Sequence, residues 1–291
     1  MIISKIQGGL GNQMFQFAAG LALARKYNVK LRLDLFQILD QRPWHSTVTK
    51  RNYALDIFQY SFPIATKLEV LRHTIPFGLN RYAAFLIKKM RPNGRNYYHE
   101  NCCQYCDIPS RAYIEGYWQN ASYFKEIKDE LKKIFILRNE LINKNSILLD
   151  KINQAKNPVC IAFRRGDYIG HPTLDIVTMD YYHNALELLD TIIPERQLFI
   201  FSDDIDWCEI NFNLSGEHII FARSESIEDS MIQDFYAICQ CHYFIIPNST
   251  FHYWGAWLAP FRDKVVIAPK AWNRQQVDDV HPILPKEWKA L

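Results

Sequence analysis

The chain has 291 residues, of which 48% are hydrophobic, and this is enough apolar surface for one large domain or two compact ones. Charged residues make up 22% of the chain, and the formal net charge is only +3. That near balance excludes the strongly basic surface of a dedicated nucleic-acid-binding protein, so we expect no nucleic-acid partner.

The first predicted element is a short strand at the amino terminus. Residues 2–6 are an apolar run, residues 8–12 read Gly-Gly-Leu-Gly-Asn, and apolar residues then recur at helical spacing over residues 14–22. We predict a strand, a glycine turn and a helix. Because glycines begin at Gly8, the segment has no room for the ~7–15 apolar residues of a signal peptide, and we expect a cytoplasmic protein.

The next part of the chain is less regular. Residues 31–34 predict a second strand, whereas the polar and aromatic residues 37–52 predict a long functional loop or an insertion. Helical patterns cover residues 67–89 and 121–134, and residues 113–114 between them are strand-like.

No window approaches the roughly 20 apolar residues of a membrane span. The best candidate, residues 83–87, is closely followed by Lys88 and Lys89. Attachment to the cytoplasmic face of a membrane therefore stays open, whereas insertion across it is not expected.

Seven cysteines in a chain without a secretion signal favour reduced thiols over a disulfide framework. Cys102, Cys103 and Cys106 form a cluster, but no second Cys or His pair follows at the spacing of a zinc site. We expect no metal.

A domain boundary is predicted at Asn157-Pro158, where a polar helix over residues 139–156 ends and the apolar strand 159–163 begins. This gives domains 1–156 and 157–291. In the second domain, strands and helices alternate regularly. The further strands are expected over residues 198–202, 218–221, 243–246 and 265–267, and the helices over 179–192, 205–208, 227–239 and 250–259. Such alternation predicts a parallel sheet covered on both faces, with ligands at the carboxyl ends of its strands.

Two arginines, Arg164 and Arg165, leave the buried strand 159–163 and precede Gly-Asp-Tyr. A guanidinium fork pairs well with phosphate oxygens, and such charge-assisted hydrogen bonds contribute about 1.5–3 kcal/mol each. The residues alone leave open a plainer alternative, a surface ion pair in which either arginine binds Asp167.

The glycine turn at residues 8–12 frees backbone amides at a helix start, where phosphates or sugar oxygens can bind. It lacks the spacing of a dinucleotide site and the lysine of a P-loop. A purely structural tight turn is an equally good interpretation.

Ser202, Asp203 and Asp204 follow another predicted strand. They could bind a ribose or cap the next helix, and capping is the default for this sequence. Paired carboxylates could also hold Mg²⁺, but the arginines already supply positive charge, so we favour no metal here.

A third loop begins with Asn248, Ser249 and Thr250, which are favoured at helix starts, and continues into an aromatic helix. The helix start is another anion site. Trp254 and Trp257 lie at helical spacing and are interpreted as core residues rather than as ligand-stacking residues.

Together these loops resemble those of the bacterial α-1,2-fucosyltransferases of glycosyltransferase family 11. That family opens with Gly-Gly-Leu-Gly-Asn-Gln-Met-Phe-Gln, found here at residues 8–16, and carries His-x-Arg-Arg-Gly-Asp-Tyr, matched at residues 162–168. Its Phe-Ser-Asp-Asp segment is found at residues 201–204. Its Asn-Ser-Ser-Phe-Ser-Trp-Trp-Gly-Ala-Trp-Leu segment is similar to residues 248–258. Weaker similarity at residues 51–56 and 116–119 extends the resemblance over nearly the whole chain.

The resemblance implies a GT-B fold, with two Rossmann-like domains and a cleft between them. GDP-fucose would be held mainly by the carboxyl-terminal domain, with the acceptor entering from the amino-terminal side. Arg164 would hold the diphosphate and is the implied catalytic residue. The other implied donor-contacting residues are Gly9, Asn12, Arg165, Asp167, Ser202, Asp203, Asp234, Asn248, Ser249 and Thr250. Of these, Arg165 is also interpreted as a structural residue braced by Asp167.

The implied reaction is inverting and metal-independent, and it needs no cofactor beyond the donor. Fucose would pass to the 2-hydroxyl of a terminal galactose on a glycan such as an O-antigen or a capsule. As the bond from fucose to phosphate breaks, charge builds on the departing GDP, and preorganised guanidinium and amide donors can stabilise that charge.

Three residues depart from the family pattern. Ala162 replaces the motif histidine, and His252 and Tyr253 replace a serine and a tryptophan. The first change removes a side-chain contact that the pattern assigns near the guanine. An alternative is therefore a catalytically impaired protein of the same fold that binds sugar nucleotides or glycans.

The general base is not identified by sequence. His171 and Asp175 follow the arginine loop, and Asp34 ends a predicted strand, but each can equally be a solvated or capping residue. A dissociative step would need little help from a base. The expected acceptor-specificity segments, residues 37–52 and 91–111, match no interpretable pattern and do not identify the acceptor.

Overall fold

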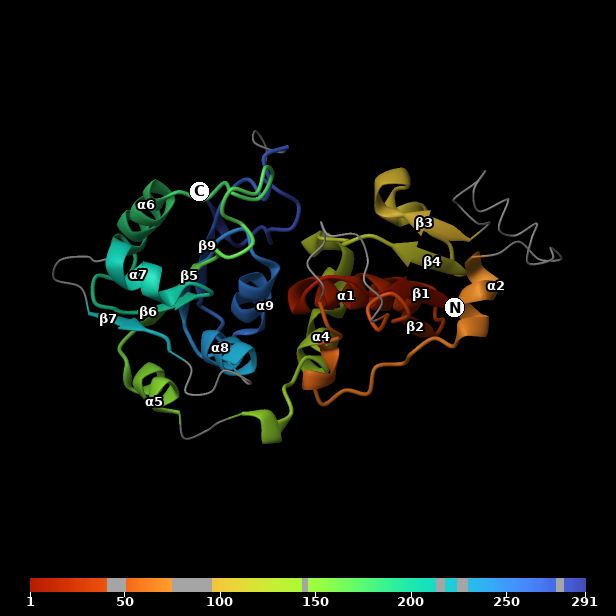
Figure 1. Cartoon of the computed structure of the whole chain (residues 1–291), viewed down its shortest axis with the longest axis horizontal. Coiled ribbons are helices and arrows are strands. Elements are labelled where there is room, and N and C mark those ends of the chain that lie inside the picture. Colours follow the sequence, from red (N-terminus) through yellow and green to blue (C-terminus); the bar gives the residue numbers. More distant parts are fainter. Residues whose placement is uncertain (41–50, 75–95, 143–145, 213–217, 224–229, 276–279) are drawn as a thin grey trace. The chain divides into compact units, whose positions relative to one another are not determined.

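A computed structural model describes residues 1–40, 51–74, 96–142, 146–212, 218–223, 230–275 and 280–291 (Figure 1). The chain forms two compact units, Met1–Ile136 and Leu137–Leu291. Each contains one parallel sheet, so the predicted α/β class is confirmed.

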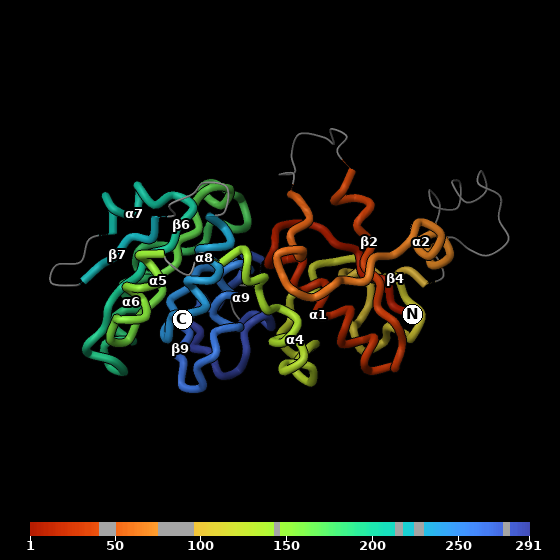
Figure 2. The backbone as a smooth tube through the Cα atoms, turned by 90° about the horizontal axis from the view of Figure 1, so that it is seen from below, coloured from red at the N-terminus to blue at the C-terminus, as the bar shows by residue number. Residues whose placement is uncertain are grey.

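The division between the units lies earlier than the boundary predicted at residue 157. Helix α5 (Ile147–Gln154) was assigned by sequence to the first domain, but it packs in the second unit against α8 (Ser230–Cys239). Both views show α5 with that unit (Figure 1 and Figure 2). Burial of Leu149 and Ile152 on one face of α5 fixes it there.

The first unit has a sheet of four parallel strands in the order β2-β1-β4-β3. These strands are β1 (Ile2–Lys5), β2 (Leu31–Asp34), β3 (Tyr97–His99) and β4 (Ala112–Glu115). Because side chains alternate along a strand, β1 contacts different elements on its two faces. The Ser4 hydroxyl donates a 2.9 Å hydrogen bond to the Gln16 carbonyl of α1 (Leu10–Lys26), whereas Ile3 packs with Val70 of α2 (Lys67–Thr74).

The second unit has a sheet of six parallel strands in the order β10-β9-β8-β5-β6-β7. They are β5 (Pro158–Phe163), β6 (Gln197–Ser202), β7 (Ile219–Phe221), β8 (Tyr243–Ile245), β9 (Val265–Ala268) and β10 (Lys289–Ala290). Numbered within the unit, this order is 6-5-4-1-2-3, the doubly wound order of dinucleotide-binding folds. Helices α6 (Met179–Asp190) and α7 (Ile205–Asn211) cover one face. Helices α8 and α9 (Thr250–Leu258) cover the other (Figure 1).

All residues of β5 are buried, as expected for a central parallel strand. Val159, Ile161 and Phe163 belong to one hydrophobic cluster with α6 and α7. Since alternate side chains point to opposite faces, Cys160 and Ala162 point toward the face covered by α8 and α9.

Most predicted elements of the second unit are confirmed within a few residues. Two helices that the sequence predicts before residue 157 are not continuous. The helix predicted over residues 121–134 is a 3₁₀ segment, Ala121–Ile127, followed by α4 (Lys128–Ile134), because Phe124 has non-helical φ and ψ angles of −120° and 16°. Among the described residues of the helix predicted over 139–156, only α5 is α-helical, and a 3₁₀ turn at Asn139–Leu141 precedes it. The other 3₁₀ turns are Leu55–Ile57, Glu100–Cys102 and Tyr105–Asp107.

The pattern over residues 67–89 is represented by α2, and its remainder lies outside the described residues, as does the membrane candidate 83–87 with Lys88 and Lys89. The expected specificity segments 37–52 and 91–111 are described only in part. Within the described ranges, no helix is both long enough and apolar enough to cross a membrane.

Helices α8 and α9 approach each other closely at Gly255. A Cβ atom built at this position would lie only 2.5 Å from Cγ2 of Ile238. The carboxyl end of α9 is also fixed, because Nζ of Lys264 donates hydrogen bonds of 2.6–2.8 Å to the carbonyls of Ala256, Trp257 and Ala259.

We predict that Gly255→Ala destabilises the protein by about 1–3 kcal/mol through overpacking, and that Ile238→Ala destabilises it by about 2–5 kcal/mol. In the double variant, the new methyl group occupies space that the isoleucine vacated. The loss should therefore be clearly smaller than the sum of the two. Urea unfolding of all four proteins measures this coupling, and strictly additive losses would contradict the proposed helix contact.

Candidate functional site

The order of strands in the second sheet reverses between β5 and β8. In doubly wound sheets, the loops that leave the carboxyl ends of two such strands diverge, and ligands bind there. The loop after β5 carries Arg164 and Arg165, and the loop after β8 carries Asn248, Ser249 and Thr250. The topology thus brings two of the predicted motifs to one position.

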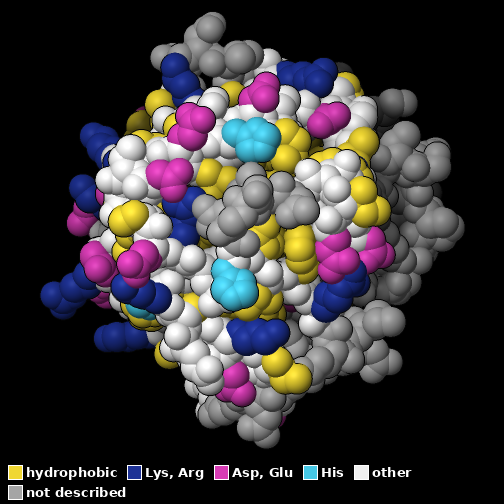
Figure 3. Space-filling model, turned by 90° about the vertical axis from the view of Figure 1, so that its left-hand side faces the viewer, with side chains coloured by type: hydrophobic (Ala, Val, Ile, Leu, Met, Phe, Trp, Pro, Cys, Tyr) yellow, Lys and Arg dark blue, Asp and Glu magenta, His cyan; other side chains and the backbone are white. Residues whose placement is uncertain are grey.

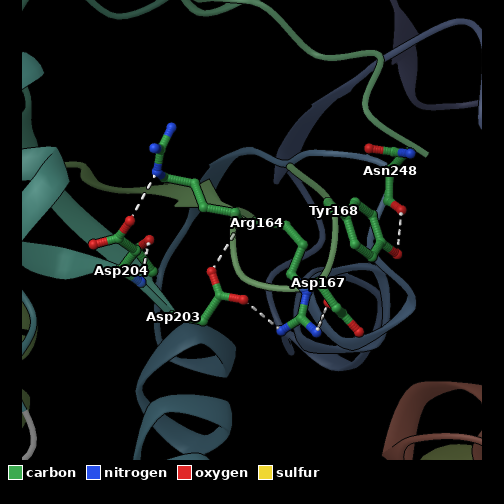
Figure 4. A network of polar contacts seen from close by, with 8 residues as sticks. Arg164, Asp167, Tyr168, Asp203, Asp204 and Asn248 are labelled. Atoms are coloured by element: carbon green, nitrogen blue, oxygen red, sulfur yellow. Dashed lines mark hydrogen bonds and ion pairs between the residues drawn. The ribbon is translucent and has the colours of Figure 1, made fainter. Parts of the chain in front are cut away.

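The guanidinium of Arg164 is held by two carboxylates (Figure 4). Its Nη2 lies 2.5 Å from Oδ1 of Asp167, and its Nη1 lies 2.9 Å from Oδ2 of Asp203. The group also lies 5.3 Å from the ring centroid of Tyr168. An arginine side chain has five N–H donors. A guanidinium that is oriented by two carboxylates therefore still has N–H donors that can bind an anionic ligand. With 24% of its side chain exposed, Arg164 is fixed and still accessible.

Arg165 is bound to α7 instead. Its Nε lies 3.1 Å from Oδ2 of Asp204, and its guanidinium lies 3.4 Å from the ring centroid of Trp207. This corrects one expectation, because Asp167 braces Arg164 and not Arg165. The stacking and the ion pair together give Arg165 a structural role, since both partners come from the element that follows β6.

The loop after β6 combines a helix cap with a bridge to the arginines. Asp204 accepts a hydrogen bond from the Trp207 amide at 3.4 Å, which confirms the predicted cap of α7. Oγ of Ser202 accepts a 2.9 Å bond from the Asp204 amide and so shapes the same turn. Asp203 instead accepts a 2.8 Å bond from the Arg165 amide, in addition to its ion pair with Arg164.

Gly166 allows Asp203 to approach this closely. A Cβ atom at position 166 would lie 2.7 Å from Oδ2 of Asp203. Any side chain there would displace the carboxylate that links the two loops.

The charges of the cluster limit the ligands that it can bind. Two arginines, Arg164 and Arg165, stand beside three aspartates at positions 167, 203 and 204, so the formal sum is 2 − 3 = −1. A simple anion gains little from such a site. A ligand that offers phosphate oxygens to Arg164 and hydroxyl groups to the carboxylates matches both kinds of partner.

Asn248 is a scaffold residue of the adjacent loop. Its Nδ2 donates 3.0 Å hydrogen bonds to the carbonyls of Leu174 and Trp272, and its own carbonyl accepts a 3.2 Å bond from the Tyr168 hydroxyl. The residue is 2% exposed. Asn248 therefore joins three loops, and this architectural role was not predicted from the sequence.

Ser249 precedes the first turn of α9, and its side chain makes no capping hydrogen bond. Thr250 is the first residue of the helix. A helix start offers backbone amides and the positive end of the helix dipole to an anion. This position is consistent with the predicted phosphate contact of both residues.

Two titratable groups lie in the helices that cover one face of this sheet, Asp234 partly exposed and His252 buried. Burial alone raises the pKa of Asp234 in α8 to about 7. Burial, together with nearby Arg164, lowers the pKa of His252 in α9 to about 3, and the ring is only 6% exposed. Among the described residues, Nδ1 of His252 has no hydrogen-bond partner. The sequence had identified His252 only as a departure from the family pattern, and its burial beside Arg164 was not predictable.

The three candidate bases each have a local partner. Asp34 is buried and accepts hydrogen bonds from the Tyr113 hydroxyl at 2.7 Å and from a backbone amide at 2.9 Å. Asp175 accepts a 2.9 Å bond from the Gly170 amide, and Nδ1 of His171 accepts bonds of 3.2 and 3.3 Å from two amides of the same loop. These contacts give all three residues a structural purpose, and a role as base stays a prediction.

The glycine turn of the first unit is the start of α1. Gly9 is the N-cap residue, and a Cβ atom placed on it would meet nothing within 4 Å. Oδ1 of Asn12 accepts a 2.9 Å hydrogen bond from Gln119. The space beside Gly9 suits a ligand, and the predicted donor contacts of Gly9 and Asn12 stay predictions.

The glutamines of the same motif have roles that the sequence did not indicate. Nε2 of Gln13 donates to the carbonyls of Gly8 and Asn52, both at 2.8 Å. Nε2 of Gln16 donates to the Gly116 carbonyl at 3.1 Å. Both side chains are buried and hold the loops around the glycine turn in place.

Basic and acidic side chains are interspersed on the face of the second unit shown in Figure 3. The part of that surface in view and described carries no broad field of one sign, in keeping with the small net charge. The described residues also contain no group of three or more His, Cys, Asp or Glu side chains that could hold a metal. Metal-independent action stays a prediction.

Comparison with known proteins gives a consistent result. The family model described as Glycosyl transferase family 11 matches residues 1–291. The chain is 30% identical to the O-antigen biosynthesis glycosyltransferase WbnK of Escherichia coli, covering 92% of this chain and 94% of that protein. It is 28% identical to an Escherichia coli alpha-1,2-colitosyltransferase over 100% and 99% of the two chains. Galactoside alpha-(1,2)-fucosyltransferase 2 of Rattus norvegicus is 25% identical over 87% of this chain and 65% of that protein.

Among solved structures, the fucosyltransferase NodZ from Bradyrhizobium matches with a TM-score of 0.50 at 12% identity. The match covers 89% of this chain and 92% of that one. At this identity the likeness concerns the fold alone, and the predicted GT-B type with two α/β domains is confirmed.

We predict that Asp234→Asn stabilises the protein at pH 8 but not at pH 5. The folded-state pKa of about 7 lies above the unfolded value of about 3.9, so the carboxylate, which has lost much of its solvation, is charged and unfavourable at pH 8 and protonated at pH 5. The gain at pH 8 should reach at most about 4 kcal/mol, at about 1.4 kcal/mol per pKa unit.

Urea unfolding at the two pH values measures the difference, and Asp150→Asn, at an exposed position of α5, is the matched control. An equal effect of Asp234→Asn on stability at both pH values would contradict the raised pKa of this carboxyl group.

Proposed function

We propose that this chain, which belongs to glycosyltransferase family 11, transfers fucose from GDP-fucose to the 2-hydroxyl of a terminal galactose on a glycan. The full-length family match confirms the resemblance seen in the sequence. A glycosyltransferase of this family acts on a sugar nucleotide and an acceptor, and the identities of both sugars form the proposal.

The observation that carries the proposal is the ion-pair cluster at the end of β5. Arg164, oriented by Asp167 and Asp203, can bind a diphosphate. The carboxylates beside it can accept hydrogen bonds from ribose or fucose hydroxyls. The start of α9, at Ser249 and Thr250, supplies further amides for the phosphates.

In the proposed reaction, the acceptor 2-hydroxyl oxygen attacks C1 of fucose from the face opposite GDP, and the hydroxyl proton is released to solvent water. The bond from C1 to the β-phosphate oxygen breaks, and the electron pair leaves with GDP. Charge therefore grows on the diphosphate, and we assign Arg164 as the preorganised donor that stabilises this charge. Because this stabilisation acts on the transition state, it raises turnover rather than only donor affinity.

Asp234 is the residue we assign to the nucleotide base. A carboxylate can accept two hydrogen bonds from the N–H groups on one edge of guanine. Its partly exposed side chain lies in α8, and loss of solvation is the only cause that raises its pKa. A bound base that donates to this carboxylate would favour its charged form.

The relatives support two donor sugars. One Escherichia coli relative is named as a colitosyltransferase, and the rat relative as a fucosyltransferase. Colitose lacks one hydroxyl group of fucose, so the two donors differ by a single hydrogen-bonding group. We place fucose first because the combined loop motifs resemble the fucosyltransferases.

A catalytically impaired sugar-nucleotide-binding protein is the second candidate. Ala162 favours it, since this position lacks the motif histidine and its small side chain lies on the α8 and α9 face of β5. Such a protein would bind GDP but form no product.

We predict that Arg164→Ala lowers turnover with GDP-fucose by about 10² or more, as expected when a preorganised donor to a developing charge is removed. Arg223→Ala is the control, because Arg223 also pairs with two carboxylates in this unit, at the surface beside α7. Near-normal transfer by the Arg164 variant, with an unchanged melting temperature, would refute the assignment.

We predict that purified protein converts galactosides to products one deoxyhexose heavier when GDP-fucose is supplied. Mass spectrometry of parallel reactions with GDP-fucose and GDP-colitose decides the donor, because the two products differ by one oxygen. Products with colitose alone would correct the donor. Binding of GDP, measured by calorimetry, without any product would support the impaired protein instead.

A further inference from the structure

The loop that follows β4 in the first unit has an unusual backbone. Gly116 has a φ of 149°, and Trp118, which is not a glycine, has a φ of 53°. A non-glycine residue in this region costs roughly 1–3 kcal/mol and persists only where its surroundings enforce it. Nε1 of Trp118 is buried and has no hydrogen-bond partner among the described residues. Strain and an unsatisfied buried donor in one loop indicate selection for something other than stability.

The loop is shaped around Glu100, which directly follows β3. Oε2 of Glu100 accepts a 2.6 Å hydrogen bond from the Tyr117 amide. A Cβ atom at position 116 would lie only 2.4 Å from Cβ of Glu100, so this arrangement requires Gly116.

The Glu100 carboxylate differs from that of its neighbour Glu115. Glu115 is bound by Nζ of Lys5 at 2.5 Å and by the Tyr97 hydroxyl, which lowers its pKa. Glu100 accepts only the amide bond, and in the described part of the chain its Oε1 has neither a hydrogen-bond donor nor a cation. One oxygen of a partly exposed carboxylate is thus available to a ligand.

Side chains suited to sugars lie on the same loop. Tyr117 is a large residue, and 44% of it is exposed to solvent. Burial of part of the phenol and the nearby Glu100 carboxylate raise the pKa of Tyr117, which keeps the hydroxyl group protonated as a donor. Nε2 of Gln119 donates a 2.9 Å bond to Asn12 at the start of α1.

Tyr117 and Gln119 follow β4, and Asn12 follows β1; the order of the first sheet reverses between these two strands. Glu100 follows β3, the neighbour of β4, and reaches this loop through its hydrogen bond with the Tyr117 amide. Ligands of parallel sheets bind at such a position. The combination of a carboxylate, two amides and an aromatic ring without a paired cation suits a neutral polyhydroxylated ligand rather than a phosphate.

We propose that this loop binds the acceptor sugar, with Oε1 of Glu100 accepting hydrogen bonds from acceptor hydroxyls and the Tyr117 ring contacting the sugar face. The inference rests on the proposed function, because it assigns the acceptor of that reaction. It concerns the first unit alone and involves none of the donor residues of the second.

The test compares Glu100→Gln with the wild type. Glutamine keeps a carbonyl oxygen for the Tyr117 amide, so the loop is retained while the charged acceptor is lost. We expect KM for the galactoside to rise about tenfold to a hundredfold, as for the loss of a charge-assisted hydrogen bond. We expect KM for the donor and its hydrolysis without acceptor to stay unchanged. Asp107→Asn, an equal charge change at an exposed position nearby, should leave all values unchanged.

Tyr117→Ala is the second variant, since it tests the site without altering Glu100, and it should also raise the acceptor KM. Saturation-transfer NMR with a galactoside, in the absence of any donor, gives a readout independent of turnover. The inference is overturned if the wild type shows galactoside signals and both variants keep them, or if both keep the acceptor KM within twofold. If the wild type binds the galactoside but transfers no sugar, the proposed function fails. The NMR signals of the wild type and the two variants then still decide whether this loop binds the galactoside.

Discussion

Arg164 is oriented by two carboxylates, and only that of Asp203 comes from a different loop of the sheet. This side chain binds the guanidinium of Arg164 and the backbone amide of Arg165, so it joins the loop after β6 to the loop after β5. Both strands are buried in the centre of a parallel sheet, and their ends are rigid. A flexible arginine attached to a rigid strand gains a fixed direction only through such a contact. Gly166 is the steric condition for it, because a Cβ atom at this position would displace the Asp203 carboxylate.

The same region holds polar groups that do not stabilise the fold. Loss of solvation alone raises the pKa of the partly exposed Asp234, and His252 is held neutral by burial and by Arg164. Groups of this kind weaken a protein unless a ligand completes their interactions. The position of His252 beside Arg164 gives its unfavourable burial a functional explanation. Donor binding would then stabilise the protein by more than its contacts with Arg164 alone provide.

The two units hold their loops in place by the same kind of hydrogen bond. Each must hold polar loops at the point where its strand order reverses, and each does so with a buried side-chain amide that bonds to loop carbonyls. Gln13 and Gln16 serve this purpose in the first unit, and Asn248 serves it in the second. These residues belong to the motifs by which the family resemblance was seen. Part of what the motifs encode is therefore the architecture of the loops rather than contact with substrate.

The sequence by itself determined the α/β class, the parallel second sheet, the cap of α7 and the family, because apolar periodicity and short polar motifs are local properties of the chain. It did not determine the assignment of α5, since a helix between two domains joins whichever core buries its apolar face. It left open which arginine pairs with Asp167, and the interpretation of Arg165 as the residue braced by Asp167 is wrong, because the partner is chosen by the directions in which two side chains leave the loop. Only the tertiary structure brought Asp203 to Arg164, Glu100 to Tyr117 and His252 into a buried position. These contacts join residues far apart in sequence or depend on burial, and no local pattern records either.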